Sequence, residues 1–121
     1  VVNDSEISIV LEFLGGEKPA CDYIRMALEN GKTVVTANKV AFALHWPELH
    51  KAAVDNLTGL YYEAAVCGAI PIIHTLEASL QANRISYIYG IVNGTTNLIL
   101  DTMQTHGSDF DDVLAQAQRA G

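Results

Sequence analysis

The segment 36–39, Thr-Ala-Asn-Lys, could do chemistry because it ends in a lysine directly after a predicted strand. In an open α/β sheet, ligands bind beyond the carboxyl ends of the strands. Lys39 could there place a positive charge against a phosphate or a developing oxyanion. A polar turn in which Asn38 caps the next helix would explain the same residues, and the spacing alone leaves both interpretations open.

Gly15 and Gly16 follow the preceding apolar run and form the second candidate segment. Glycine lets a ligand approach the backbone closely, but an ordinary exit from a strand also uses glycine. The chain contains no GxGxxG motif. If the protein binds a dinucleotide, we therefore expect its phosphate-binding loop to precede Val1.

A single carboxylate, Glu63, precedes a loop of small residues at 64–71. Such a loop can turn several backbone carbonyls toward a hard cation, and one negative ligand among neutral oxygens suits a monovalent ion such as sodium. The alternative is a carboxylate that pairs with a nearby backbone amide. Cys67 has no histidine near it in the sequence, so we expect a small buried residue rather than a nucleophile.

The segment 93–97, Asn-Gly-Thr-Thr-Asn, joins a predicted strand to a predicted helix. Backbone amides at a helix N-terminus favour a carboxylate or a phosphate, whereas simple capping by threonine is the alternative. The four histidines show no metal-ligand spacing, so they are predicted to be surface or packing residues. They are His45, His50, His74 and His106.

The apolar residues follow strand and helix periods that order these segments along the chain. The run 7–13 predicts a strand covered on both faces, and 32–36 predicts a second strand. Between them, an apolar stripe predicts a helix that begins at Pro19 and stops at Gly31. Strand, crossover helix, strand is a right-handed βαβ unit, so this part is predicted to end a doubly wound sheet.

The rest of the chain is predicted to form a second, mixed α/β unit after two short helices at 40–44 and 47–56. Its expected elements are a strand at 60–64, a helical stripe over 72–80, a long strand at 84–93, a helix at 98–104 and a last helix capped by Ser108. The buried stripe of that last helix is expected to be Phe110, Val113, Leu114 and Ala117.

The composition is that of a globular domain with an acidic surface. Half of the 121 residues are hydrophobic, and the formal net charge is −7. That charge argues against nucleic acid and against an anionic membrane surface as partners. No apolar run approaches the roughly 20 residues of a membrane span. The two isolated cysteines form no CxxC pair, which favours a reducing, cytoplasmic location.

Taken in order, the motifs resemble the homoserine dehydrogenase family. The similarity rests on VVTANKVAFALHWPELHKAA, YYEAAVCGAIPII and GIVNGTTNLILDTM, with EFLGGEKPACDYIRMALENGK before them. It extends from about Ile7 to Gly121, and the motifs are highly specific when taken together. The resemblance implies an α/β fold: the C-terminal part of a Rossmann-type domain at 1–56, then part of a substrate-binding and dimerisation domain at 57–121. It also implies NADP- or NAD-dependent interconversion of aspartate 4-semialdehyde and L-homoserine by a homodimer.

The resemblance assigns roles to particular residues. Lys39 matches the catalytic lysine near the nicotinamide, where it contacts the cofactor and handles a proton. The other cofactor-binding positions are Gly15, Gly16, Thr36 and Asn38. Glu63 matches the side-chain ligand of a structural cation, with backbone carbonyls from Val66, Gly68 and Ile70. Gly94 and Thr95 match the loop beside the substrate.

Two departures from the family pattern and several missing features limit these assignments. Cys67 and Ala69 stand where glycine is common in the family, although a site built from carbonyls tolerates both. The chain has no starting methionine and lacks the phosphate loop and the later acidic residues and second lysine, so we expect an internal fragment that is inactive alone. Another Rossmann-type dehydrogenase of a small amino acid or semialdehyde, and a non-catalytic dimerisation and cation-binding module, are the alternatives.

Overall fold

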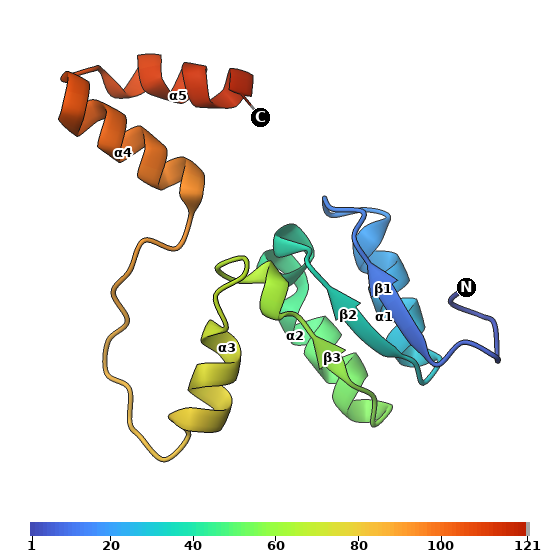
Figure 1. The fold of residues 1–121 in the computed structure, drawn as a ribbon. Coiled ribbons are helices and arrows are strands. Elements are labelled where there is room, and N and C mark those ends of the chain that lie inside the picture. Colours follow the sequence, from blue (N-terminus) through green and yellow to red (C-terminus); the bar gives the residue numbers. More distant parts are fainter. Residues whose placement is uncertain (121) are drawn as a thin grey trace. The chain divides into compact units, whose positions relative to one another are not determined.

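The computed structural model describes residues 1–120, which form two compact units (Figure 1). The first unit is Val1–Asn83, and the second begins at Arg84. The first holds a small parallel sheet with two long helices, and the second holds a pair of helices. The predicted α/β class is confirmed. Among the described residues, no helix is both long and apolar enough to span a membrane.

The sheet of the first unit has three parallel strands in the order β1-β2-β3. They are β1 (Ile9–Glu12), β2 (Thr33–Thr36) and β3 (Leu60–Tyr61). Val10 pairs with Val34, which pairs in turn with Leu60. Helix α1 (Ala20–Glu29) connects the first two strands, and α2 (Lys39–Asp55) connects the second to the third. The predicted βαβ unit is therefore confirmed, and a second one overlaps it.

Helices α1 and α2 cover one face of this sheet, and the core lies between them and the strands (Figure 1). Ile24, Leu28 and Leu49 are fully buried there, and burial of each such side chain stabilises the fold by about 1.5–3 kcal/mol. The prediction that the first strand is covered on both faces is wrong for the described residues. Ile9 and Leu11 point to the other face and stay 57% and 62% exposed. The strands follow one another across the sheet in the order β1-β2-β3. Because both crossover connections are right-handed, α1 and α2 lie on the same face of the sheet.

Helix α2 is kinked close to Pro47, where a second short helix was expected to begin. Pro47 lies inside the helix, and His45 two residues earlier has non-helical angles of φ −126° and ψ 15°. Proline lacks an amide hydrogen, and its ring clashes with the carbonyl one turn earlier, so the helix bends here. The two short helices expected at 40–44 and 47–56 are two segments of α2 that meet at this kink.

The chain after β3 is less regular than the sequence suggested. The expected strand at 60–64 ends at Tyr61, because Tyr62 has ψ 18° and leaves the extended conformation. A short 3₁₀ turn, η1 (Glu63–Ala65), follows. The expected helix over 72–80 forms as α3 (Ile72–His74) continued by the π-helical turn η2 (Thr75–Ser79).

The second unit is a helical hairpin of α4 (Gly94–His106) and α5 (Phe110–Ala120) around Ile99, Val113 and Ala117. The expected strand at 84–93 is wrong for the described chain, where this segment pairs with no other strand. A strand needs a backbone partner, and alternation alone supplies none. Phe110 is 47% exposed rather than buried.

The ends of these helices also differ from expectation. Helix α4 begins at Gly94 rather than at 98, and Gly107 ends it in the left-handed conformation. The amide of Asp111 donates to the Asp109 carboxylate at 3.1 Å. Asp109 therefore caps α5, in place of the expected Ser108.

Candidate functional site

A buried carboxylate, Glu12, organises the carboxyl end of β1. It is 4% exposed and accepts a 2.6 Å hydrogen bond from the Thr36 hydroxyl at the end of β2. It also accepts from the amides of Leu14 at 2.8 Å and Gly15 at 3.4 Å. The sequence analysis did not single out Glu12. Its signal was an acidic residue inside the apolar run 7–14, three positions before the first of two glycines.

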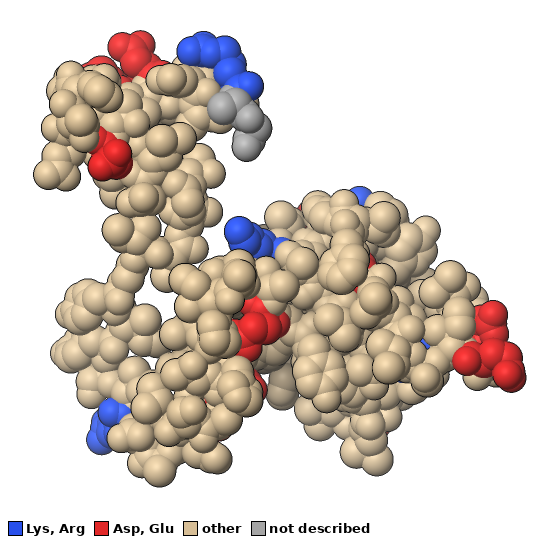
Figure 2. Space-filling view, in the orientation of Figure 1, with Lys and Arg blue, Asp and Glu red and all other residues tan. Residues whose placement is uncertain are grey.

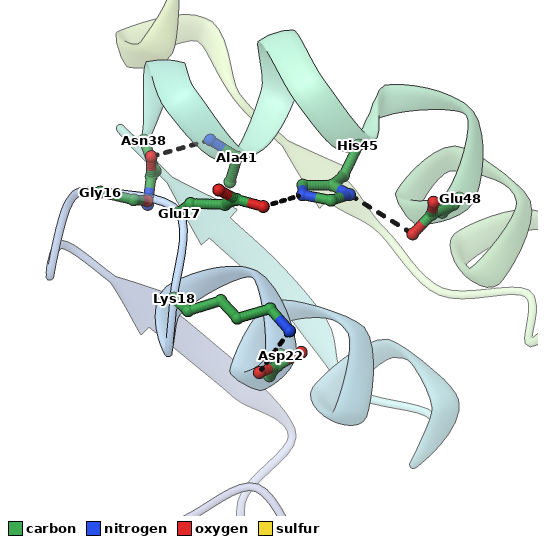
Figure 3. A network of polar contacts seen from close by, with 8 residues as sticks. All are labelled: Gly16, Glu17, Lys18, Asp22, Asn38, Ala41, His45 and Glu48. Carbon is green, nitrogen blue, oxygen red and sulfur yellow. Dashed lines mark hydrogen bonds and ion pairs between the residues drawn. The ribbon is translucent and has the colours of Figure 1, made fainter.

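Asn38 joins the two candidate segments at this edge of the sheet. Its amide nitrogen Nδ2 donates to the Gly16 carbonyl at 2.8 Å, and its Oδ1 accepts from the Ala41 amide at 3.0 Å (Figure 3). The backbone amide of Asn38 donates to the Thr36 hydroxyl at 3.0 Å. The predicted cap of the following helix is confirmed. Because Thr36 and Asn38 are buried, we expect them to position the segment rather than expose side chains to a ligand.

The loop 15–17, called the glycine loop below, has a conformation that requires its two glycines. Gly15 has φ +72° and Gly16 has φ +70°, the left-handed region that L side chains rarely adopt. An added Cβ at either position would meet no atom within 4 Å. The left-handed φ angles, rather than a lack of room for a side chain, therefore favour glycine at both positions. Open space remains beside the loop for a ligand to approach.

Gly16→Ala should lower stability by about 1–2 kcal/mol, the cost of the left-handed conformation for an L residue. Gly90→Ala is the matched control, because Gly90 has no left-handed φ and a Cβ there would lie 3.8 Å from its nearest neighbour. Thermal unfolding of the two variants measures the difference. Equal midpoints for both would contradict the conformational argument.

Lys39 is exposed and is the first residue of α2. Within residues 1–120 its ammonium group makes no ion pair or hydrogen bond. The positive end of a helix dipole disfavours a cation at this position.

His45 links the glycine loop to α2. Its Nε2 lies 3.0 Å from Glu17 Oε1, and its Nδ1 lies 3.5 Å from Glu48 Oε2 (Figure 3). Its side chain is 22% exposed. Lys18 and Asp22 form a separate ion pair nearby, at 4.0 Å. The histidine was expected to be a surface or packing residue, and the sequence offered no sign of its contact with a residue 28 positions earlier.

Glu63 accepts backbone hydrogen bonds with both oxygens. The Ile73 amide donates to Oε1 at 2.8 Å, and the His74 amide donates to Oε2 at 2.9 Å. This is the alternative that the sequence left open, although each oxygen keeps a further lone pair.

The loop after Glu63 turns at Cys67 and Gly68, which have φ +56° and +63°. The Ile70 carbonyl accepts from the Ile72 amide at 2.8 Å. Cys67 is only partly buried, contrary to expectation.

Gly94 and Thr95 lie in the second unit, at the start of α4. The side chain of Asn93 caps this helix, since its Oδ1 accepts from the Thr96 amide at 2.8 Å and from the Thr96 hydroxyl at 3.2 Å. The alternative of capping by threonine is therefore wrong, because the asparagine before the glycine supplies the acceptor. Gly94 and Thr95 are exposed.

A pocket of about 500 Å³ in the first unit was not expected from the sequence. Its wall includes Trp46 and Tyr62, whose rings meet edge to face at 5.0 Å. The Tyr62 hydroxyl donates to Glu77 at 3.4 Å. Burial raises the pKa of the Tyr62 phenol, and the negative charge of Glu77 raises it further. On α1, burial likewise raises the pKa of the Cys21 thiol, which disfavours a thiolate there.

Charged side chains are scattered over the molecule. On the face that Figure 2 shows, the Lys and Arg side chains of the described residues lie apart in both units and form no basic stripe. Recognition of a nucleic-acid backbone uses a clustered basic face. The face in Figure 2 does not have that character.

Two sequence families match the chain. The model of the homoserine dehydrogenase NAD-binding domain matches residues 1–63, and that of homoserine dehydrogenase matches residues 71–121. Homoserine dehydrogenase from Synechocystis sp. is 48% identical over all 121 residues, and the chain spans 28% of its length.

Solved structures agree with these matches. The crystal structure of a homoserine dehydrogenase from Thiobacillus denitrificans superimposes with a TM-score of 0.90 and 50% identity, over the whole chain and 28% of that protein. A hyperthermophilic archaeal homoserine dehydrogenase in complex with NADPH superimposes with a TM-score of 0.83 and 31% identity, over 99% of this chain and 37% of that one.

Proposed function

The chain belongs to the homoserine dehydrogenase family, and on that premise we propose that its protein interconverts aspartate 4-semialdehyde and L-homoserine with NADP or NAD. The observation that carries the proposal is the junction of the glycine loop with the Asn38-Lys39 segment through the 2.8 Å contact between Asn38 and Gly16. This junction lies beyond the carboxyl ends of β1 and β2, where open α/β sheets bind ligands. The match to an NAD-binding domain and the similarity to an NADPH complex support the cofactor.

The residues fit a nicotinamide at this position. Gly15 and Gly16 leave open space in which a flat ring can approach their backbone. Lys39 supplies a free ammonium group next to the same loop. Thr36 donates to Glu12, and Asn38 donates to the Gly16 carbonyl, so both residues fix the position of the glycine loop relative to the segment that carries Lys39.

Lys39 is the proposed proton-transfer group. The bound cofactor supplies or takes the hydride. During reduction, the Lys39 ammonium donates a proton to the oxygen of the aldehyde as its carbon becomes an alcohol. During oxidation, the neutral amine accepts the proton of the homoserine hydroxyl as the carbonyl forms. The exposed position of Lys39 leaves its amine free to approach a substrate oxygen.

Gly94 and Thr95 are proposed to line the substrate at the start of α4, where amides that Asn93 does not cap can bind a carboxylate. The division into residues 1–56 and 57–121, and assembly as a homodimer, are proposed from membership of the family. The two free cysteines support a reducing, cytoplasmic location. The acidic net charge of −7 supports a small-molecule substrate rather than nucleic acid or a membrane.

The loop after Glu63 is proposed to hold a monovalent cation, best matched by sodium, with carbonyls from Val66, Gly68 and Ile70. One carboxylate and three neutral oxygens suit a hard ion of single charge. The left-handed turn at Gly68 supports the proposal, because it redirects successive carbonyls within a few residues.

Sodium should therefore stabilise the complete protein more than choline at equal ionic strength. An ion at ten times its Kd adds about 1.4 kcal/mol to the free energy of unfolding. Glu63→Gln should abolish this difference between the two salts, even though the lost helix contacts lower the unfolding midpoint in both. Thr75→Val, which removes a hydroxyl that bonds the Pro71 carbonyl nearby, is the matched control. An unchanged sodium effect in Glu63→Gln would contradict the site.

The function is tested on the complete protein that contains this chain. Homoserine-dependent reduction of NAD and of NADP is followed by nicotinamide absorbance, with serine and threonine as competing alcohols. Turnover of homoserine supports the proposal, and turnover of another small amino acid alone would favour the other dehydrogenases. A folded dimer without turnover would favour a binding module. The 121-residue chain by itself is expected to be inactive.

A further inference from the structure

The imidazole of His45 faces a carboxylate with each of its nitrogens. Glu17 lies 3.0 Å from Nε2, and Glu48 lies 3.5 Å from Nδ1. A neutral imidazole has one N–H and would turn a lone pair toward one of the two carboxylates. The ring therefore has a donor available for one carboxylate in its neutral form and for both in its imidazolium form.

The two carboxylates belong to different parts of the first unit. Glu48 is on α2, as His45 is, one turn beyond it. Glu17 instead follows Gly15 and Gly16 directly and belongs to the glycine loop. The contact with Glu17 therefore crosses from α2 to the loop, whereas the contact with Glu48 stays within the helix (Figure 3).

Four contacts hold the glycine loop to the scaffold. Glu12 accepts from the amide of Gly15, and Asn38 donates to the carbonyl of Gly16. At Glu17, the Cys21 amide donates to the backbone carbonyl at 2.9 Å, and His45 contacts the side chain. Two consecutive glycines in the left-handed conformation have little intrinsic preference for one arrangement. Contacts outside the loop must therefore select it, and His45 supplies the contact that fixes the side chain of Glu17 on α2.

We propose that His45 is a positioning residue that holds the glycine loop in the arrangement which receives the nicotinamide half of the cofactor. This inference rests on the proposed function, because it assigns the loop to the nicotinamide. The kink of α2 at His45 contributes, since the residue departs from helical geometry where its ring reaches Glu17.

Two carboxylates contact the ring directly, Glu17 of the glycine loop and Glu48 of α2. The same two carboxylates also act on Cys21 of α1, together with Asp22 and Arg25. Lys18 pairs with Asp22 and Arg25 pairs with Glu29, so these charges are partly balanced on α1 itself. The unbalanced carboxylates near the ring are Glu17 and Glu48.

The test compares His45→Gln and Glu17→Gln with the complete wild-type protein. Each variant should raise the KM for the nicotinamide cofactor about three- to tenfold, as expected for loss of a partly exposed polar contact, and should change kcat less than about twofold. The double variant should add little to either single variant, because both remove the same interaction.

Glu48→Gln is the matched control, since it removes a carboxylate beside the same ring without touching the loop. Its KM should stay within about twofold of wild type. An unchanged KM in both His45→Gln and Glu17→Gln, or a larger effect from Glu48→Gln than from Glu17→Gln, would overturn the positioning role. Glu17 is 47% exposed at its side chain, so Glu17→Gln keeps the test valid if His45→Gln folds poorly.

Direct titration with NADPH separates this inference from the proposed function. If homoserine is not turned over but the Kd for NADPH still rises in both variants, the positioning role stands and the proposed reaction fails. If homoserine is turned over and neither KM nor Kd depends on His45, the reaction stands and the positioning role fails. A protein that does not bind NADPH or NADH would overturn both.

Discussion

Lys39→Ala in the complete protein should lower the turnover of homoserine by about 100-fold or more, the usual scale for a general acid–base group. The cofactor supplies no proton donor for the substrate oxygen, so the reaction depends on a group such as the Lys39 ammonium. Lys39 is exposed at the start of α2, and its loss disturbs no contact among the described residues. The protein should therefore fold normally, and the effect should fall on kcat.

Lys51→Ala provides the matched control for Lys39→Ala. Lys51 is also an exposed lysine of α2, paired on the helix surface with Asp55. Its removal should change kcat less than about twofold, because surface ion pairs contribute little. Lys39→Arg keeps the charge but holds its proton too firmly for transfer, so it should resemble Lys39→Ala. Turnover within about threefold of wild type in Lys39→Ala would refute the acid–base role.

Glu12→Ala should destabilise the complete protein by about 2–4 kcal/mol, because it leaves several buried donors without an acceptor. The Thr36 hydroxyl and the amide of Leu14 both donate to the Glu12 carboxylate at 2.8 Å or less. The same carboxylate holds the start of the glycine loop, so cofactor binding should weaken together with stability. Denaturant unfolding measures the first effect, and NADPH titration measures the second.

Two variants calibrate the prediction for Glu12. Glu12→Gln keeps the size of the side chain but has one acceptor oxygen in place of two, so its cost should be smaller than that of alanine. Glu29→Ala removes an exposed carboxylate that pairs only with Arg25 on α1, and should cost less than about 0.5 kcal/mol. If Glu12→Ala were as stable as Glu29→Ala, the buried network would not hold the site.

The sequence by itself determined most elements of the first unit and some of their ends. Gly31 stops α1, as predicted, and Asn38 caps α2, which was one of the two alternatives for its segment. Pro47 was expected to open a second helix and instead lies in α2 beside its kink. These signals work because each depends on the φ angle or the hydrogen-bonding groups of a few neighbouring residues. The order strand, helix, strand then leaves one handed arrangement for the βαβ unit, so the fold class also followed from the sequence.

Only the tertiary structure decided which side chains meet across the chain. Glu12 meets Thr36 from 24 residues away, and His45 meets Glu17 from 28 residues away. No local pattern encodes such pairs, because they depend on how α1 and the strands bring distant segments together. For the same reason the alternation at 84–93 did not become a strand: alternation specifies faces, but pairing depends on a neighbouring backbone. The residue types therefore indicated the chemistry of the candidate site, whereas only the fold showed which contacts hold those residues in place.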